Sequence, residues 1–188
     1  MPSTKVTIVY YSQTGTVSAM AARLAQTAEA QGAEVRLRSV GRDNDEVSAG
    51  EPARPTADDI VWADVVLLGS PTRYGNIAGR LKVFLDGLGA QWATGQLADK
   101  VYAGFTSSQT LHGGQETTLL ALYNTVIHFG GILVTPGYTD GSKFVDGNPY
   151  GVSHATGGDN DIPLGQPQLD ALDHLAQRTI AIARRLQG

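Results

Sequence analysis

Near its N-terminus the chain reads Lys5-Val6-Thr7-Ile8-Val9-Tyr10-Tyr11-Ser12-Gln13-Thr14-Gly15-Thr16-Val17. The apolar, β-branched first part predicts a buried strand, and the helical period that starts at Val17 predicts an amphipathic helix that stops at Gly32. Hydroxyl groups and free backbone N–H groups at the start of a helix form a site for an anion, which the helix dipole strengthens. The loop 12–16 is therefore a candidate phosphate site, although an ordinary helix N-cap has the same composition.

Strands and helices alternate through the rest of the chain. Short apolar or alternating runs predict further strands at 34–40, 64–69, 101–105 and 131–135. Apolar residues at helical spacing predict helices at 77–88, 119–127 and 169–183. We expect Asn76 to cap the first of these helices, and the strand at 64–69 to be central because it is apolar throughout. This alternation predicts a single α/β domain over residues 1–188, built on an open, parallel, doubly wound sheet of five strands.

Two segments interrupt this pattern. The first, at about 41–58, contains the polar, charged stretch 41–55, for which we expect a mobile surface loop. The second, at 137–167, places Tyr138, Phe144 and Tyr150 among many glycines and prolines and has almost no periodicity. A long segment of this kind in a compact domain usually serves function or assembly.

The composition narrows the classes of function. The net charge is −4, and Lys and Arg form no run, which argues against nucleic acid as the main partner. Because the chain has no cysteine, disulfides and thiolate metal sites are excluded. We expect no metal, and any redox chemistry would require a bound cofactor. We find neither the pattern of a signal peptide nor an apolar run of the ~18–20 residues that a membrane helix needs, and we expect a soluble, cytoplasmic protein.

Three unusual loops follow predicted strands, at the carboxyl edge where open parallel sheets bind ligands. The loop 12–16 has no Lys and matches neither GxxxxGK[ST] nor GxGxxG, which argues against a nucleoside triphosphate or a dinucleotide pyrophosphate. The loop 70–76 combines hydrogen-bond donors, a positive charge and room for close approach, which a flavin ring requires. The loop 106–114 is rich in glycine and hydroxyl groups and can contact the ribityl chain or the pyrimidine edge of a flavin.

Several short motifs are spread over nearly the whole chain. They are Tyr10-Tyr11-Ser12, Pro71-Thr72-Arg73-Tyr74-Gly75-Asn76, Phe84-Leu85-Asp86, Trp92-Ala93-Thr94-Gly95, Gly113-Gly114-Gln115-Glu116 and Gly147-Asn148-Pro149-Tyr150-Gly151. In this order they resemble the WrbA family of NAD(P)H:quinone oxidoreductases, within the flavodoxin-like superfamily. The resemblance implies a three-layer αβα sandwich with strand order 2-1-3-4-5, FMN as cofactor and a homotetramer. It also implies a two-electron transfer from NAD(P)H through FMN to a quinone, for which we expect a ping-pong cycle.

The resemblance also implies roles for individual residues. The FMN-binding residues would be Ser12, Gln13, Thr14, Gly15, Thr16, Val17, Pro71, Thr72, Arg73, Tyr74, Gly75, Asn76, Ser108, Gln109, Thr110, Leu111, His112, Gly113 and His128. Trp92 resembles the aromatic wall of the substrate pocket, contributed to the flavin of a neighbouring subunit. His128 resembles a histidine near the pyrimidine end of the flavin, but an ordinary helix-end residue is an equal alternative. Thr14 departs from the family, which often has an aromatic residue there for the nicotinamide.

Two other functions compete with this prediction. An electron-carrier flavodoxin would bind FMN without oxidising NAD(P)H, but such carriers are often more acidic than this chain. A transcriptional accessory protein is suggested only by the older name of the family, tryptophan-repressor-binding protein, and nothing basic in the sequence supports it. The enzyme is therefore the first hypothesis and the electron carrier the second.

Overall fold

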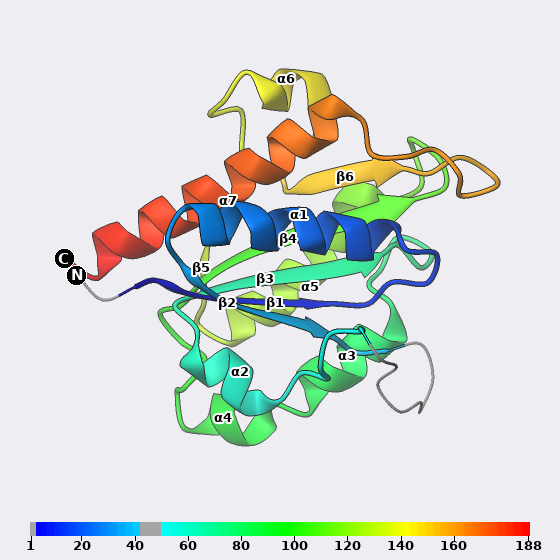
Figure 1. The fold of residues 1–188 in the computed structure, drawn as a ribbon. Coiled ribbons are helices and arrows are strands. Elements are labelled where there is room, and N and C mark those ends of the chain that lie inside the picture. The colour runs from blue at the N-terminus through cyan, green and yellow to red at the C-terminus, as the bar shows by residue number, and fades with distance from the viewer. Residues whose placement is uncertain (1–2, 42–49) are drawn as a thin grey trace.

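The computed structural model describes residues 3–41 and 50–188, and Figure 1 shows its ribbon. Its strands are β1 (Lys5–Tyr10), β2 (Glu34–Ser39), β3 (Val65–Pro71), β4 (Val101–Ser108), β5 (Ile132–Leu133) and β6 (Val152–Ala155). They form one parallel sheet in the order β2-β1-β3-β4-β5, with β6 paired to β4. The predicted fold class and strand order are confirmed, and the sixth strand is an addition to them.

Helices cover both faces of the sheet (Figure 1). They are α1 (Thr16–Ala30), α2 (Ala57–Trp62), α3 (Gly79–Asp86), α4 (Gly89–Ala93), α5 (Gln115–His128), α6 (Ser142–Asp146) and α7 (Gln166–Leu186). The buried faces of α1 and α7 share one apolar core with the sheet, and those of α3 and α5 share another. Every residue of β3 and β4 is buried as a result. In the described part of the chain, no helix is both long enough and apolar enough to cross a membrane.

The fifth position of the sheet is shared by two short strands. β5 pairs with the start of β4, at Val101 and Tyr102, whereas β6 pairs with its last four residues, Phe105–Ser108. The chain leaves the sheet after β5, forms α6 and returns as β6. The expectation of a strand over 131–135 is therefore too long, and the segment 137–167, whose sequence has almost no periodicity, contains the short helix α6 and the short strand β6. Strands of two and four residues are too short to give a periodic signal.

Buried polar contacts hold this excursion against the sheet. The side chains of Lys143 and Asp146 are both 0% exposed and form an ion pair, and Lys143 Nζ also donates to the carbonyl of Gly151 at 2.9 Å. Tyr123 on α5 accepts a hydrogen bond from the Gly104 N–H at 3.1 Å and donates to the carbonyl of Tyr150. Burial raises the pKa of Tyr123 well above its ordinary value, so the phenol stays protonated and remains a donor.

Some predicted boundaries need correction. The expectation that Asn76 caps a helix is wrong, because α3 begins at Gly79 after Ala78. Asn76 instead closes a tight turn, in which its N–H and carbonyl pair with those of Arg73. β3 and β4 extend to Pro71 and Ser108, so two of the predicted loops begin later than expected. The first interruption ends in the unpredicted helix α2, and residues 42–49 of the predicted loop lie outside the described residues.

Candidate functional site

A cleft of about 560 Å³ lies at the carboxyl edge of the sheet. Its walls are the segments that follow β1, β3, β4 and β6. The lining residues are Gln13, Thr14, Pro71, Thr72, Arg73, Tyr74, Ser107, Ser108, Gln109, Thr110, Gly113, Thr156 and Asn160. Residues from all three predicted loops therefore meet at one place. This is the edge at which parallel α/β sheets bind their ligands.

The first wall is the loop between β1 and α1. Gly15 caps α1 with a left-handed backbone (φ 101°), and no side chain forms a hydrogen bond at this N-cap. Ser12 Oγ accepts a hydrogen bond from the Gly15 N–H at 3.2 Å. The first turn of α1, all of which is described, contains no acidic residue. The positive end of the helix dipole thus lies beside Gln13 and Thr14 without a compensating carboxylate, which is an arrangement that binds anions.

The second and third walls are joined through Thr72. Its Oγ1 accepts a hydrogen bond from the Gly75 N–H at 3.2 Å, lies 2.8 Å from Thr118 Oγ1, and is 3.3 Å from the carbonyl of Gly113. Two glycines let the loops approach closely, because a Cβ on Gly114 would lie 2.7 Å from the Cα of Gly75. These contacts fix the two loops relative to each other without any ligand.

Arg73 and Tyr74 extend from the second wall. Arg73 supplies positive charge to the cleft, and its Nη1 donates to the carbonyl of Thr72 at 3.1 Å. Tyr74 has a left-handed backbone (φ 55°) and a fully exposed side chain. A bulky residue in this strained conformation costs free energy, and such residues cluster at functional sites. Its ring is free to lie against a planar ligand.

The fourth wall was not predicted. Thr156 and Asn160, which follow β6, line the cleft beside the residues that follow β4, and Ser107 lines it from within β4. Thr156 Oγ1 lies 2.9 Å from Asn160 Oδ1, and Gln109 Nε2 donates to the carbonyl of Gly158 at 3.0 Å. The Gly157-Gly158-Asp159-Asn160 stretch is a turn signal that could have indicated this wall. The sequence does not place this turn at the cleft, because its position depends on the pairing of β6 with β4.

The remaining predicted residues do not line this cleft. Ser12, Gly15, Thr16 and Val17 adjoin it, and the side chain of Val17 is buried in the core under α1. Gly75, Asn76, Leu111 and His112 belong to the loops that form it. Trp92 and His128 lie elsewhere, since Trp92 Nε1 donates to the carbonyl of His128 at 2.7 Å and His128 ends α5. With a rise of 1.5 Å per residue, the two ends of α5 are roughly 20 Å apart, and the cleft is at the other end.

Comparison with known proteins identifies the chain's relatives. The family model described as NADPH-dependent FMN reductase matches residues 4–142. A protein from Deinococcus radiodurans named NAD(P)H dehydrogenase (quinone) is 39% identical over 98% of both chains. A protein of the same name from Sinorhizobium fredii is 37% identical over 97% of this chain and 98% of its own.

Solved structures agree on the fold. A WrbA-like flavodoxin from Agrobacterium tumefaciens has a TM-score of 0.74 at 23% identity, over 97% of this chain and 99% of its own. Flavodoxin 1 from Bacillus cereus has a TM-score of 0.67 at 14% identity, over 95% and 98%. The fold is therefore flavodoxin-like, and the predicted resemblance to WrbA is confirmed. The chain belongs to the NADPH-dependent FMN reductase family and, with its relatives from Deinococcus radiodurans and Sinorhizobium fredii, to the NAD(P)H dehydrogenases (quinone).

Proposed function

We propose that this chain is an FMN-dependent NAD(P)H:quinone oxidoreductase of the cytoplasm, with FMN in the cleft at the carboxyl edge. The observation that carries the proposal is the arrangement of the cleft. At one end lies the N-terminus of α1, which has no side-chain cap. At the other end lie two loops that glycines allow to approach closely, together with an arginine and an exposed tyrosine. The names of its relatives give the substrates: NAD(P)H and a quinone.

The residues present fit FMN. The N-terminus of α1 and the hydroxyls of loop 12–16 would hold the phosphate, because they offer donors and no opposing carboxylate. The second and third walls would hold the ring, because Gly75 and Gly114 bring the two loops into contact. The predicted roles of Gln13, Thr14, Thr72, Arg73, Ser108 and Gly113 are in keeping with their place in the cleft. Leu111 and His112 do not line the cleft, so their predicted roles in binding FMN would have to come from backbone atoms.

The reaction transfers two electrons and a proton from NAD(P)H to a quinone, with a second proton from water, and yields NAD(P)+ and the hydroquinone. When bound, FMN supplies the group that accepts a hydride and passes the electron pair on. The chain's own residues would position the bound molecules and stabilise negative charge on them. Arg73 lies where its charge favours a negatively charged ligand, and Tyr74 can stack on a planar substrate. None of the cleft residues has to act as a general acid, because the cleft opens to water.

A substitution at Asn160 tests whether the fourth wall holds FMN. Thr156 Oγ1 lies within hydrogen-bonding distance of Asn160 Oδ1, which directs the Asn160 amide N–H₂ away from Thr156, and acceptors are abundant on FMN. Asn160→Asp keeps the shape but replaces that donor by a carboxylate. We expect the Kd for FMN, measured by quenching of flavin fluorescence, to rise about tenfold or more.

Asn160→Gly is the matched control for backbone effects, because residue 160 has a left-handed backbone (φ 58°) that glycine adopts without strain. This variant should keep the wild-type fold and weaken FMN less than Asn160→Asp does. Equal FMN affinity in all three proteins would show that the fourth wall is not part of the site.

Steady-state kinetics tests the proposed activity. Oxidation of NADPH by the purified protein should require both FMN and a quinone, and double-reciprocal plots at several quinone concentrations should be parallel, as a ping-pong cycle requires. An electron carrier would bind FMN equally well but would leave NADPH unchanged. FMN binding without any quinone-dependent oxidation of NADPH or NADH would therefore favour the carrier and reject the enzyme.

We also propose a homotetramer in which Trp92 and His128 of one subunit face the cleft of another. Both residues are exposed and remote from the cleft of their own chain, and Ile127 beside them is 62% exposed. We expect Trp92→Ala to lower quinone turnover and to leave the Kd for FMN unchanged. Sedimentation velocity provides the second readout, because a fully active monomer would rule out a shared site.

A further inference from the structure

One buried hydroxyl in the cleft has no partner in the protein. The buried serines and threonines that line the cleft are Ser107, Ser108 and Thr156. Ser108 Oγ donates to the carbonyl of Thr110 at 2.6 Å, and Thr156 Oγ1 lies 2.9 Å from Asn160 Oδ1. Ser107 is only 5% exposed, yet its Oγ forms no hydrogen bond within the described part of the chain. Because an unpaired buried hydroxyl costs free energy, its place in a cleft indicates a partner outside the chain.

The neighbours of Ser107 in the sheet explain why its hydroxyl is unpaired. Ser107 lies in register with Pro71 of β3 on one side and with His154 of β6 on the other. Side chains of residues paired in this way point to the same face of a parallel sheet. The ring of Pro71 carries no hydrogen-bonding group, and His154 Nε2 donates to the carbonyl of Ile162 at 2.8 Å. The sheet therefore leaves the hydroxyl available to a ligand.

The alternation of side chains along β4 places Ser107 on the face of the sheet that α1 covers. Phe105, two residues earlier, packs in the core that the sheet shares with α1 and α7. Ser108 points to the opposite face, where Gln115 on α5 donates to its Oγ at 2.8 Å. The proposed phosphate site is the N-terminus of α1, so Ser107 lies on the same side of the sheet as that site.

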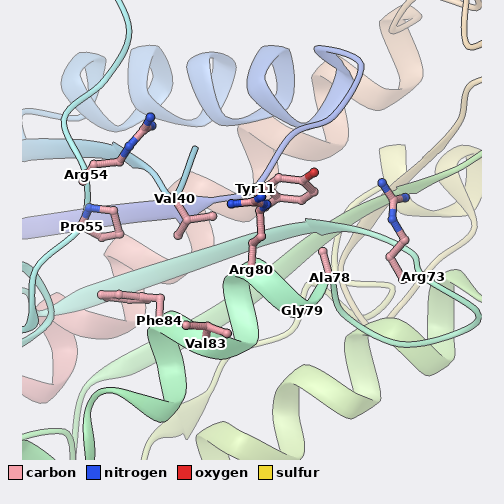
Figure 2. Close-up of a pocket in the computed structure, with 10 residues that line it drawn as sticks. All are labelled: Tyr11, Val40, Arg54, Pro55, Arg73, Ala78, Gly79, Arg80, Val83 and Phe84. Atoms are coloured by element: carbon pink, nitrogen blue, oxygen red, sulfur yellow. The ribbon is translucent and has the colours of Figure 1, made fainter. Parts of the chain in front are cut away.

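The open space beside Ser107 is the cleft. Among the described side chains, only Asp146 Oδ1 is a fully enclosed polar atom without a hydrogen-bond partner, so Ser107 Oγ reaches open space. Figure 2 shows a second cavity, of about 950 Å³, which shares Arg73 with the cleft. Ser107 is not among the described residues that line this second cavity. A ligand would therefore meet the Ser107 hydroxyl from within the cleft.

We propose that Ser107 is a further FMN-binding residue, whose hydroxyl forms a hydrogen bond with the polar tail of the cofactor, that is, with its ribityl chain or its phosphate. The proposal rests on the proposed function, since it requires FMN in the cleft. A hydroxyl both donates and accepts, and the tail carries hydroxyl groups and phosphate oxygens. The motifs do not indicate this residue, because the residues that they assign to this loop begin at Ser108.

A series of flavins tests this contact in Ser107→Ala, with fluorescence quenching as the measure of Kd. We expect the Kd for FMN to rise about three- to tenfold if the hydroxyl contacts the ribityl chain, and more than about tenfold if it contacts the phosphate. Riboflavin, which lacks the phosphate, should weaken by the same factor in the first case and be unaffected in the second. Lumiflavin, which has the ring without the tail, should bind the variant and the wild type equally.

Stability in urea separates a ligand contact from a structural role. Because Ser107 Oγ has no partner in the protein, Ser107→Ala should leave the unfolding midpoint of the FMN-free protein unchanged. Thr7→Val is the matched control, since Thr7 is a buried residue of β1 whose Oγ1 donates to the carbonyl of Asp59 at 2.8 Å. This control should lower the midpoint and keep the Kd for FMN.

The outcomes also separate this proposal from the proposed function. Unchanged FMN affinity in Ser107→Ala, or an equal loss for lumiflavin and FMN, overturns the contact and leaves the proposed function in place. A loss confined to flavins that carry the tail supports the contact even if the protein reduces no quinone, in which case only the proposed activity fails. A wild-type protein that binds no FMN overturns both.

Discussion

Replacing Lys143 by methionine is expected to lower the free energy of unfolding by about 3–5 kcal/mol, because it leaves Asp146 buried without its cation. Both side chains are 0% exposed, and Asp146 Oδ1 already has no hydrogen-bond partner among the described residues. Burial raises the pKa of Asp146 and lowers that of Lys143, so desolvation opposes the charged state of each group. Lys143 Nζ also donates to Gly151, at the point where the chain returns to the sheet as β6.

Urea unfolding measures this effect, and two further variants locate its cause. Lys82→Met removes the cation of an exposed pair with Asp86 and should cost no more than about 0.5 kcal/mol. Lys143→Met/Asp146→Leu removes both buried charges and should recover most of the loss. If Lys143→Met were as stable as the wild type, the pair would not be what fastens α6 to the sheet. A loss of FMN affinity in Lys143→Met is also expected, because β6 carries Thr156 and Asn160 to the cleft.

Placing a carboxylate at the first position of α1 is expected to have the largest effect on FMN. Thr16→Asp puts a negative charge where the phosphate is proposed to lie, and two like charges about 4 Å apart near a protein surface repel each other by about 4 kcal/mol. Counterions and side-chain movement reduce this, so we expect the Kd for FMN to rise about 100-fold. The same substitution should raise the stability of the unliganded protein by about 0.3–1 kcal/mol, because an acid at a helix N-terminus favours the helix dipole.

These opposite changes distinguish a phosphate site from damage to the fold. Riboflavin, which lacks the phosphate, should bind Thr16→Asp and the wild type with nearly equal affinity. Gln26→Asp is the matched control, because it adds the same charge at an exposed position of the same helix, about 15 Å from Thr16. The assignment of loop 12–16 to the phosphate is wrong if riboflavin and FMN weaken equally, or if neither does.

The sequence alone predicts the positions of those parts of the candidate site that lie in the regular βα units. The run of apolar residues before Ser12 and the helical period after Val17 place the first loop at the carboxyl edge, and the same reasoning holds for Thr72 and Gly113. These segments are long enough for their periodicity to be seen. The core of the sheet follows from the same patterns, as the complete burial of β3 and β4 shows.

The remainder depends on contacts between distant segments. β5 is shorter than predicted and β6 was not predicted, because the lengths and places of both strands are set by pairing with β4 rather than by local preference. Thr156 and Asn160 could not be assigned to the cleft for that reason. Trp92 and His128 can serve the cleft only through a second copy of the chain.

The most direct measurement is the visible absorption of protein-bound FMN after rapid anaerobic mixing with NADPH, followed by addition of a quinone. The account predicts that NADPH bleaches the flavin band within the turnover time of the enzyme, and that the quinone restores it with one hydroquinone formed for each NADPH oxidised. A flavin band that neither NADPH nor NADH changes would contradict it.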